Sequence, residues 1–123
     1  MKTNAAGWFE IYVQDMSRAR GFYENLLGVT LERLNSPAIE MWAFPMNSES
    51  YGASGALVYM SGYPSGGNST LIYFSCENCA DEESRVESAG GRLHRGKISI
   101  GEYGFITLAF DTEGNMFGLH SLQ

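Results

Sequence analysis

Basic residues are scarce in this chain. There are 8 Lys and Arg against 14 Asp and Glu, which gives a formal net charge of −6 and a pI near 4.8. Binding to nucleic acid or to an anionic membrane normally requires a positively charged surface. The composition therefore argues against both as the main partner, while it is compatible with a cationic ligand.

Long apolar runs are also missing. No stretch approaches the roughly 20 apolar residues needed to span a membrane, and the first residues, MKTNAAGW, lack the apolar core of a signal peptide. We therefore expect a cytoplasmic protein. Neither G-x-G-x-x-G nor a phosphate-binding loop occurs, and GASGA at 52–56 lacks the glycine spacing of a nucleophile elbow. The sequence therefore contains no motif that predicts a catalytic site.

Only two cysteines are present, Cys76 and Cys79, in the arrangement C-E-N-C. A Cys-x-x-Cys between a strand and a helix is where a thioredoxin-type redox site would lie. The βαβ context of that fold does not follow, and no second Cys or His pair completes a zinc site. Residue 76 alternates with Ile72 and Phe74, so its side chain is expected to face the core. We expect two small buried thiols rather than a redox or metal site.

A strand, a tight turn and an amphipathic helix are predicted over residues 8–28. Alternation places Trp8, Glu10 and Tyr12 on one face of the strand. Asp15 fits the position of a helix N-cap, and Gly28 fits the end of the helix, where a positive φ is usual. The apolar residues between them recur at roughly helical spacing.

The remaining chain continues this order and then repeats it. Strands are predicted at 29–33, 38–45 and 56–60, followed by the Gly/Pro/Ser-rich segment 61–69. A strand at 71–76 comes next, then a helix from Asn78 or Cys79 to Gly90-Gly91, and strands at 92–100, 103–110 and 115–122. A shift of 63 residues superposes Trp8 on Leu71 and Gly28 on Gly91.

We therefore predict one α+β domain over residues 1–123, made of two βαβββ modules at about 1–62 and 63–123. The repeat rests on element order and spacing, since residue identity between the halves is almost nil. The alternative is a single ferredoxin-like α+β sandwich with extra strands, which explains less of the symmetry.

Motifs at both ends of the chain resemble one known family. The segment Val13-Gln14-Asp15, followed by Phe22-Tyr23 and Leu27-Gly28, resembles the opening of the vicinal oxygen chelate (VOC) superfamily. The turn D-T-E-G-N at 111–115 and G-L-H-S at 118–121 resemble its terminal turn and strand. The superfamily includes glyoxalases, bleomycin resistance proteins and extradiol dioxygenases. In detail, W-F-E-I near the start and G-L-H-S at the end resemble a small bacterial branch of unsettled activity.

The resemblance implies paired βαβββ modules whose curved sheets form a half-open barrel around a pocket, usually in a homodimer. Metal-dependent members take His, Gln or Glu ligands from the first and last strand of each module. The matching positions here are Trp8, Leu71 and Gly118, with Val58 as the approximate fourth. None of these side chains can bind a metal ion. We therefore expect no metal and no cofactor at these positions, although a displaced site using Glu10 and His120 is conceivable.

Strand alternation then predicts an aromatic pocket with few polar groups, as is usual for a small-molecule site. Leu71, Tyr73 and Ser75 should share the pocket face of the second module, and Met116, Gly118 and His120 that of the last strand. The candidate ligand-binding residues are Trp8, Glu10, Tyr12, Trp42, Phe44, Tyr73, Tyr103, Met116 and His120.

The leading hypothesis is a protein that binds a small hydrophobic or aromatic molecule without a metal, as bleomycin resistance proteins do by sequestration. A cation–π contact with Trp8 or Trp42, beside Glu10, would suit a positive group on that ligand. The alternative is a metal-independent or displaced-metal enzyme of lyase or isomerase type using Glu10 and His120. A third possibility is a vestigial pocket in an interaction protein.

Overall fold

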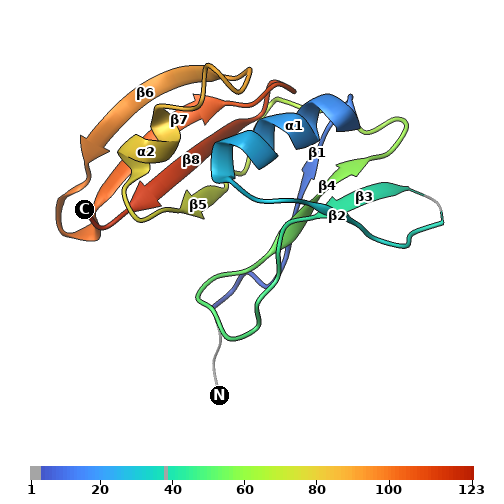
Figure 1. Ribbon diagram of the computed structural model, residues 1–123, viewed down its shortest axis with the longest axis horizontal. Coiled ribbons are helices and arrows are strands. Elements are labelled where there is room, and N and C mark those ends of the chain that lie inside the picture. The colour runs from blue at the N-terminus through green and yellow to red at the C-terminus, as the bar shows by residue number, and fades with distance from the viewer. Residues whose placement is uncertain (1–3, 38) are drawn as a thin grey trace.

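A computed structural model gives the structure of the chain and describes residues 4–37 and 39–123. Two halves follow one another, each with a strand, a helix and three strands (Figure 1). The first half contains β1 (Phe9–Tyr12), α1 (Met16–Leu27), β2 (Glu32–Arg33), β3 (Glu40–Ala43) and β4 (Gly55–Tyr59). The second contains β5 (Tyr73–Ser75), α2 (Cys79–Glu83), β6 (Arg92–Ser99), the 3₁₀ turn η1 (Gly101–Tyr103), β7 (Phe105–Phe110) and β8 (Met116–Ser121). The predicted pair of βαβββ modules is confirmed.

Each half forms its own four-stranded mixed sheet. The strand orders are β1-β4-β3-β2 and β5-β8-β7-β6, with one parallel pair in each sheet, β1 with β4 and β5 with β8. The remaining neighbours are antiparallel. The strand order is the same in both sheets. The internal repeat predicted from element order and spacing is therefore a repeat of sheet topology.

Local signals at both ends of α1 act as predicted. Asp15 is extended and its Oδ1 accepts a hydrogen bond from the N–H of Arg18, which satisfies one free donor of the first turn. Gly28 ends the helix with φ 67°, which a side chain would disfavour. The apolar face buries Phe22, Tyr23 and Leu26. In Figure 1 this helix lies between the two sheets.

The second helix is shorter than predicted and covers only Cys79–Glu83. Beyond it the chain forms turns, in which the hydroxyls of Ser84 and Ser88 donate to carbonyls three residues earlier. Such side-chain bonds compete with regular helix geometry. Of the two glycines at the predicted end of this helix, Gly90 has a positive φ, at 108°, and Gly91 does not. A side chain at Gly91 would instead collide with Phe22 and with the carbonyl of Phe110.

Strand bounds also differ from the expected ranges. The second predicted strand, 29–33, pairs only at Glu32 and Arg33, and the strand predicted from residue 71 begins at Tyr73. Ala38, where another strand was expected to begin, and residues 1–3 lie outside the described residues.

An aromatic cluster joins the two sheets behind α1. The ring of Phe74 from β5 lies 6.0 Å from that of Phe9, 5.7 Å from that of Phe44 and 5.9 Å from that of Phe117, measured between centroids. Tyr23 of α1 contacts three of these rings at 5.7 to 5.8 Å. Aromatic pairs at such distances contribute beyond the area they bury. The core is therefore continuous across both modules.

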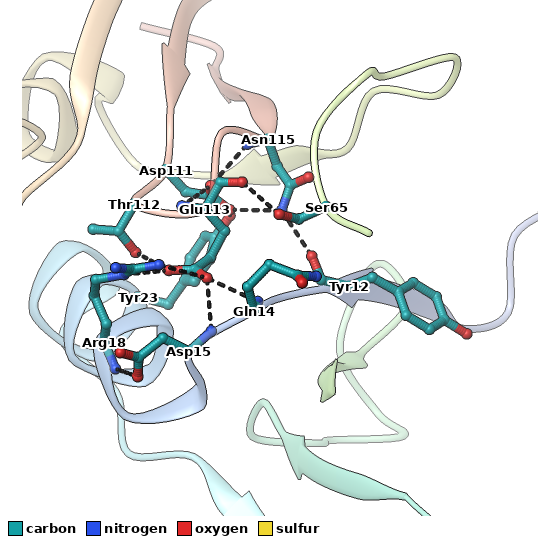
Figure 2. A network of polar contacts seen from close by, with 10 residues as sticks. All are labelled: Tyr12, Gln14, Asp15, Arg18, Tyr23, Ser65, Asp111, Thr112, Glu113 and Asn115. Atoms are coloured by element: carbon teal, nitrogen blue, oxygen red, sulfur yellow. Dashed lines mark hydrogen bonds and ion pairs between the residues drawn. The ribbon is translucent and has the colours of Figure 1, made fainter. Parts of the chain in front are cut away.

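A polar network fastens the turn between β7 and β8 to the junction of β1 and α1 (Figure 2). The Oε1 atom of Glu113 accepts from the N–H groups of Gln14, at 2.8 Å, and Asp15, at 2.9 Å. Its Oε2 accepts from Arg18 Nε at 2.7 Å and from the hydroxyl of Thr112 at 2.9 Å. Burial raises the pKa of this carboxyl, but the hydrogen bonds from Arg18 and the two N–H groups outweigh it and lower the pKa from 4.5 to about 2.

Asp111 and Asn115 complete the network. Asp111 Oδ2 accepts from the hydroxyl of the buried Tyr23 at 2.6 Å, and Oδ1 accepts from the N–H groups of Glu113 and Asn115. The side-chain amide of Asn115 donates to the carbonyl of Tyr12 and accepts from the N–H of Gly66. The turn D-T-E-G-N thus contacts the first strand, the first helix and the segment between the modules.

Glu113→Gln is expected to lower the free energy of unfolding by about 2–4 kcal/mol at pH 7, because an amide nitrogen would face donors around a buried site. The folded pKa of Glu113 is depressed, so its stabilisation is present above pH 4.5 and declines as the pH falls towards about 2. Urea denaturation at several pH values measures both effects. The exposed Glu77→Gln is the matched control and should stay within about 0.5 kcal/mol of the native chain. A pH-independent difference between native and Glu113→Gln proteins would contradict this account.

Candidate functional site

The face of the first sheet opposite α1 carries Trp8, Glu10 and Tyr12, as predicted by alternation. Glu10 accepts two hydrogen bonds from its neighbours: Trp8 Nε1 donates to Oε2 at 3.3 Å and the Tyr12 hydroxyl donates to Oε1 at 2.9 Å. The bond to Glu10, followed by burial, raises the pKa of Tyr12. Trp8 remains 40% exposed, so solvent reaches this face.

The corresponding face of the second sheet carries Tyr73, Ser75 and His120. Tyr73 pairs with Gly118 and Ser75 with His120, and paired residues share a face. Tyr73 is 45% exposed, and its ring occupies the space above Gly118 where a side chain would stand. One ring nitrogen of His120, Nε2, lies 2.7 Å from the carbonyl oxygen of Tyr103.

Trp42 and Phe44 lie on the opposite face from the one predicted. The register pairs Trp42 with Leu57, whose side chain is in the core, so Trp42 faces α1. The Arg20 guanidinium carbon lies 3.5 Å from the centroid of the Trp42 ring. Phe44 is only 6% exposed and belongs to the aromatic cluster. The loops before and after β3 determine which alternate side chains of this strand face α1. The sequence of these loops does not predict that choice.

Three cavities are relevant to the predicted residues. One of about 200 Å³ is lined by Glu10, Tyr12 and Met116. Another, of about 490 Å³, is lined by Tyr73 and His120, together with Tyr51, Ser75, Ile100 and Ile106. The structure thus brings the predicted residues together in two groups. Glu10 and Tyr12 of the first sheet meet Met116 of β8, whereas Tyr73 and His120 both belong to the second sheet, so Glu10 and His120 line different cavities. Tyr103, 70% exposed, lies at neither cavity and meets the second group through its carbonyl.

The third cavity, of about 380 Å³, was missed by sequence reasoning. It lies on the helix side, between the aromatic cluster, α2 and the loop 45–54, with Phe9, Phe44, Phe74 and Glu82 among its lining residues. These residues come from segments far apart in the sequence, and no local pattern connects them. The available signals were the alternation of Ile72, Phe74 and Cys76 and the candidate residue Phe44, which lines this cavity.

A comparison with known protein families identifies the family of this chain. The family model described as "Glyoxalase/Bleomycin resistance protein/Dioxygenase superfamily" matches residues 5–119. The chain belongs to this superfamily. No match was found among curated proteins.

Several solved structures share the fold of this chain. A hypothetical protein from S. aureus aligns with a TM-score of 0.71 at 19% identity, covering 94% of this chain and 96% of that one. TnmS3, an antibiotic binding protein from a Streptomyces species, aligns with a TM-score of 0.71 at 19% identity, covering 100% and 99%. Glyoxalase I from Zea mays aligns at 0.72 and 21% identity, covering 93% of this chain and 43% of that one.

By the resemblance given above, the ligand positions of metal-dependent members are expected at Trp8, Leu71 and Gly118, with Val58 as the approximate fourth. These side chains offer neither carboxylate, imidazole nor thiolate. Within residues 4–37 and 39–123, no group of three or more His, Cys, Asp and Glu is arranged to hold a metal ion. Among the same residues, no helix is long and apolar enough to cross a membrane.

The two cysteines are free thiols packed near the core, as predicted. Cys79 is fully buried at the start of α2, and Cys76 is half-buried against the core cluster. Burial, followed by the nearby carboxylate of Glu82, raises the pKa of Cys76 from 9.0 to about 12. A nucleophilic cysteine needs the opposite shift. This environment argues against a redox role for C-E-N-C.

Cys76 is expected to react with iodoacetamide at pH 7.5 at least about 100-fold more slowly than an ordinary exposed thiol, because so little thiolate forms. The matched comparison is Ser75→Cys in a Cys76→Ala background, which moves the thiol by one residue to the exposed face of β5. Mass spectrometry of the alkylated tryptic peptide measures both rates. Equal rates would restore the redox hypothesis.

Proposed function

We propose that this superfamily member binds a small hydrophobic or aromatic molecule, without a metal ion, at the helix-free faces of its two sheets. One observation carries the proposal. Both faces present aromatic side chains to solvent, Trp8 on the first and Tyr73 on the second, although each sheet buries apolar residues on its other side. Exposed aromatic surface beside a cavity is typical of a binding site.

The polar groups on these faces are few and held in place. Glu10 is held by Trp8 and Tyr12, and His120 by the carbonyl of Tyr103. Apolar walls with a few fixed polar groups are the usual make-up of a ligand site. The description of TnmS3 as an antibiotic binding protein supports this class of function for the fold.

A homodimer is part of the proposal. Small-molecule sites usually bury 70–90% or more of the ligand surface, whereas the cavity at Tyr73 is lined by exposed side chains, with Tyr73 45% and Tyr51 88% exposed. A second copy of the chain, placed over the open faces, would cover this cavity. Enclosure between two copies also explains why apolar Ile98 and Ile106 stand on this face of the second sheet.

Enzymatic use of Glu10 and His120 has less support. A shared general acid–base site needs both groups within reach of one substrate. Here each lines a different cavity of the chain, and the Nε2 atom of His120 already lies at hydrogen-bond distance from the Tyr103 carbonyl oxygen.

Tyr73→Ala is expected to weaken binding of a neutral aromatic probe, 2-naphthol, by about tenfold or more, because it removes one aromatic wall of the site. Tyr59→Ala is the matched control: Tyr59 is similarly exposed, at 39%, but it lies on the helix side of β4. Isothermal titration calorimetry measures both affinities. The proposal fails if 2-naphthol and a wider panel of aromatic compounds do not bind the native protein, and such a result would favour an interaction protein with a vestigial pocket.

Light scattering is expected to give a mass of twice 13.5 kDa, and binding of 2-naphthol should be unaffected by a chelator. The mass tests the dimer separately from ligand binding. Elemental analysis of protein purified without chelator completes the test. A stoichiometric metal ion required for binding would contradict the metal-free part of the proposal.

A further inference from the structure

The chain contains two Trp–Glu pairs built in the same way. In each, a tryptophan and a glutamate stand two residues apart on one face of a strand. Trp8 Nε1 donates to Glu10 Oε2 at 3.3 Å, and Trp42 Nε1 donates to Glu40 Oε2 at 3.0 Å. Each bond places a carboxylate at the edge of an indole ring, leaving the face of the ring free for another group.

At Trp42 that other group is a cation from the chain itself. The guanidinium carbon of Arg20 lies 3.5 Å from the centroid of the Trp42 ring, and Arg20 also forms an ion pair with Glu24 at 3.5 Å. A cation over an indole face is attracted by the negative π surface of the ring. The first sheet therefore already holds one complete unit of indole, carboxylate and cation on its helix side.

At Trp8, residues 4–37 and 39–123 supply no such cation. Within the described part of the chain, no Lys, Arg or His nitrogen lies within 4.0 Å of a Glu10 carboxylate oxygen. No cation from that part stands over the Trp8 ring either. Instead Glu10 accepts a second bond from the Tyr12 hydroxyl at 2.9 Å. The Tyr12 ring is in turn stacked on Tyr63, with centroids 5.8 Å apart.

We infer that Trp8, Glu10 and Tyr12 form a recognition site for a positively charged amine group of the ligand, either protonated or quaternary. The inference rests on the proposed function and specifies its ligand class: a hydrophobic or aromatic molecule that carries such an amine. Glu10 supplies the countercharge, and the two rings that bind it supply π surface on either side. The apolar part of the ligand then extends over the aromatic face or into the adjoining cavity of about 200 Å³.

The geometry explains why both rings donate to one carboxylate. The two bonds fix the rings and the anion relative to each other, so little freedom is lost when a cation binds. Neither bond neutralises the charge of Glu10, since indole and phenol are neutral donors. A net charge of −6 adds a favourable long-range field for a cationic ligand.

The test uses two probes of the same shape and different charge, (4-hydroxyphenyl)trimethylammonium and 4-tert-butylphenol. We expect the native protein to bind the ammonium about tenfold or more tightly than the neutral compound. Glu10→Gln should abolish that preference, measured as the ratio of the two affinities in the same variant. Glu40→Gln is the matched control, since its pair already holds Arg20, and it should keep the preference.

Proton NMR locates the contact, because the chain has two tryptophans and therefore two indole N–H signals. The ammonium should shift the signal of Trp8, assigned with Trp8→Leu, and not that of Trp42. Equal affinities for the two probes, or a preference that survives in Glu10→Gln, would overturn the amine site and leave the proposed function intact. If neither probe binds although 2-naphthol does, the amine site is again refuted. Failure of all three compounds and of the wider aromatic panel would refute the proposed function itself.

Discussion

The buried carboxylate of Glu113 holds the two ends of the chain together. It lies in a turn near the C-terminus, and four of its five donors belong to Gln14, Asp15 and Arg18 near the N-terminus. Charge-assisted bonds of this kind are stronger than neutral ones, and two of them go to N–H groups at the start of α1. These bonds therefore fix the first turn of α1 against the second module. The strands of the first sheet that follow α1 in sequence are positioned by their packing on this helix.

The position of α1 decides which face of each sheet is free. The helix and the aromatic cluster around Phe74 cover one side of the first sheet and reach the buried side of the second. What stays open is the other side of both sheets, with Trp8, Glu10 and Tyr12 on one and Tyr73 and His120 on the other. The other faces are open because α1 and the aromatic cluster join the two sheets on one side only. A ligand that binds an open face would contact its aromatic side chains.

Local chemistry made much of the fold predictable. Asp15, Gly28 and the D-T-E-G-N turn each act through bonds to residues close by or through a backbone angle, so their roles can be inferred from type and spacing. The same alternation located Trp8, Glu10 and Tyr12 correctly on one face. The prediction for Trp42 and Phe44 gave the wrong face of the sheet. A one-residue shift in the pairing of a strand moves every side chain to the opposite face, and here the register of β3 with β4 determines the face. The early end of α2 was not predicted, and the bonds of Ser84 and Ser88 to carbonyls three residues earlier are seen only in the folded turn.

The absence of a side chain at Gly118 has a wider meaning. By resemblance, this residue is expected at the last-strand position at which metal-dependent members of the superfamily carry a ligand. The ring of Tyr73 fills the space where the Cβ of residue 118 would be. A glutamate or histidine there would have to displace the ring, and the ring in its present place leaves no room for either. An aromatic wall and a metal-binding side chain are therefore mutually exclusive at this point of the sheet. Placing a glutamate or histidine at residue 118 would therefore require a second change, at Tyr73.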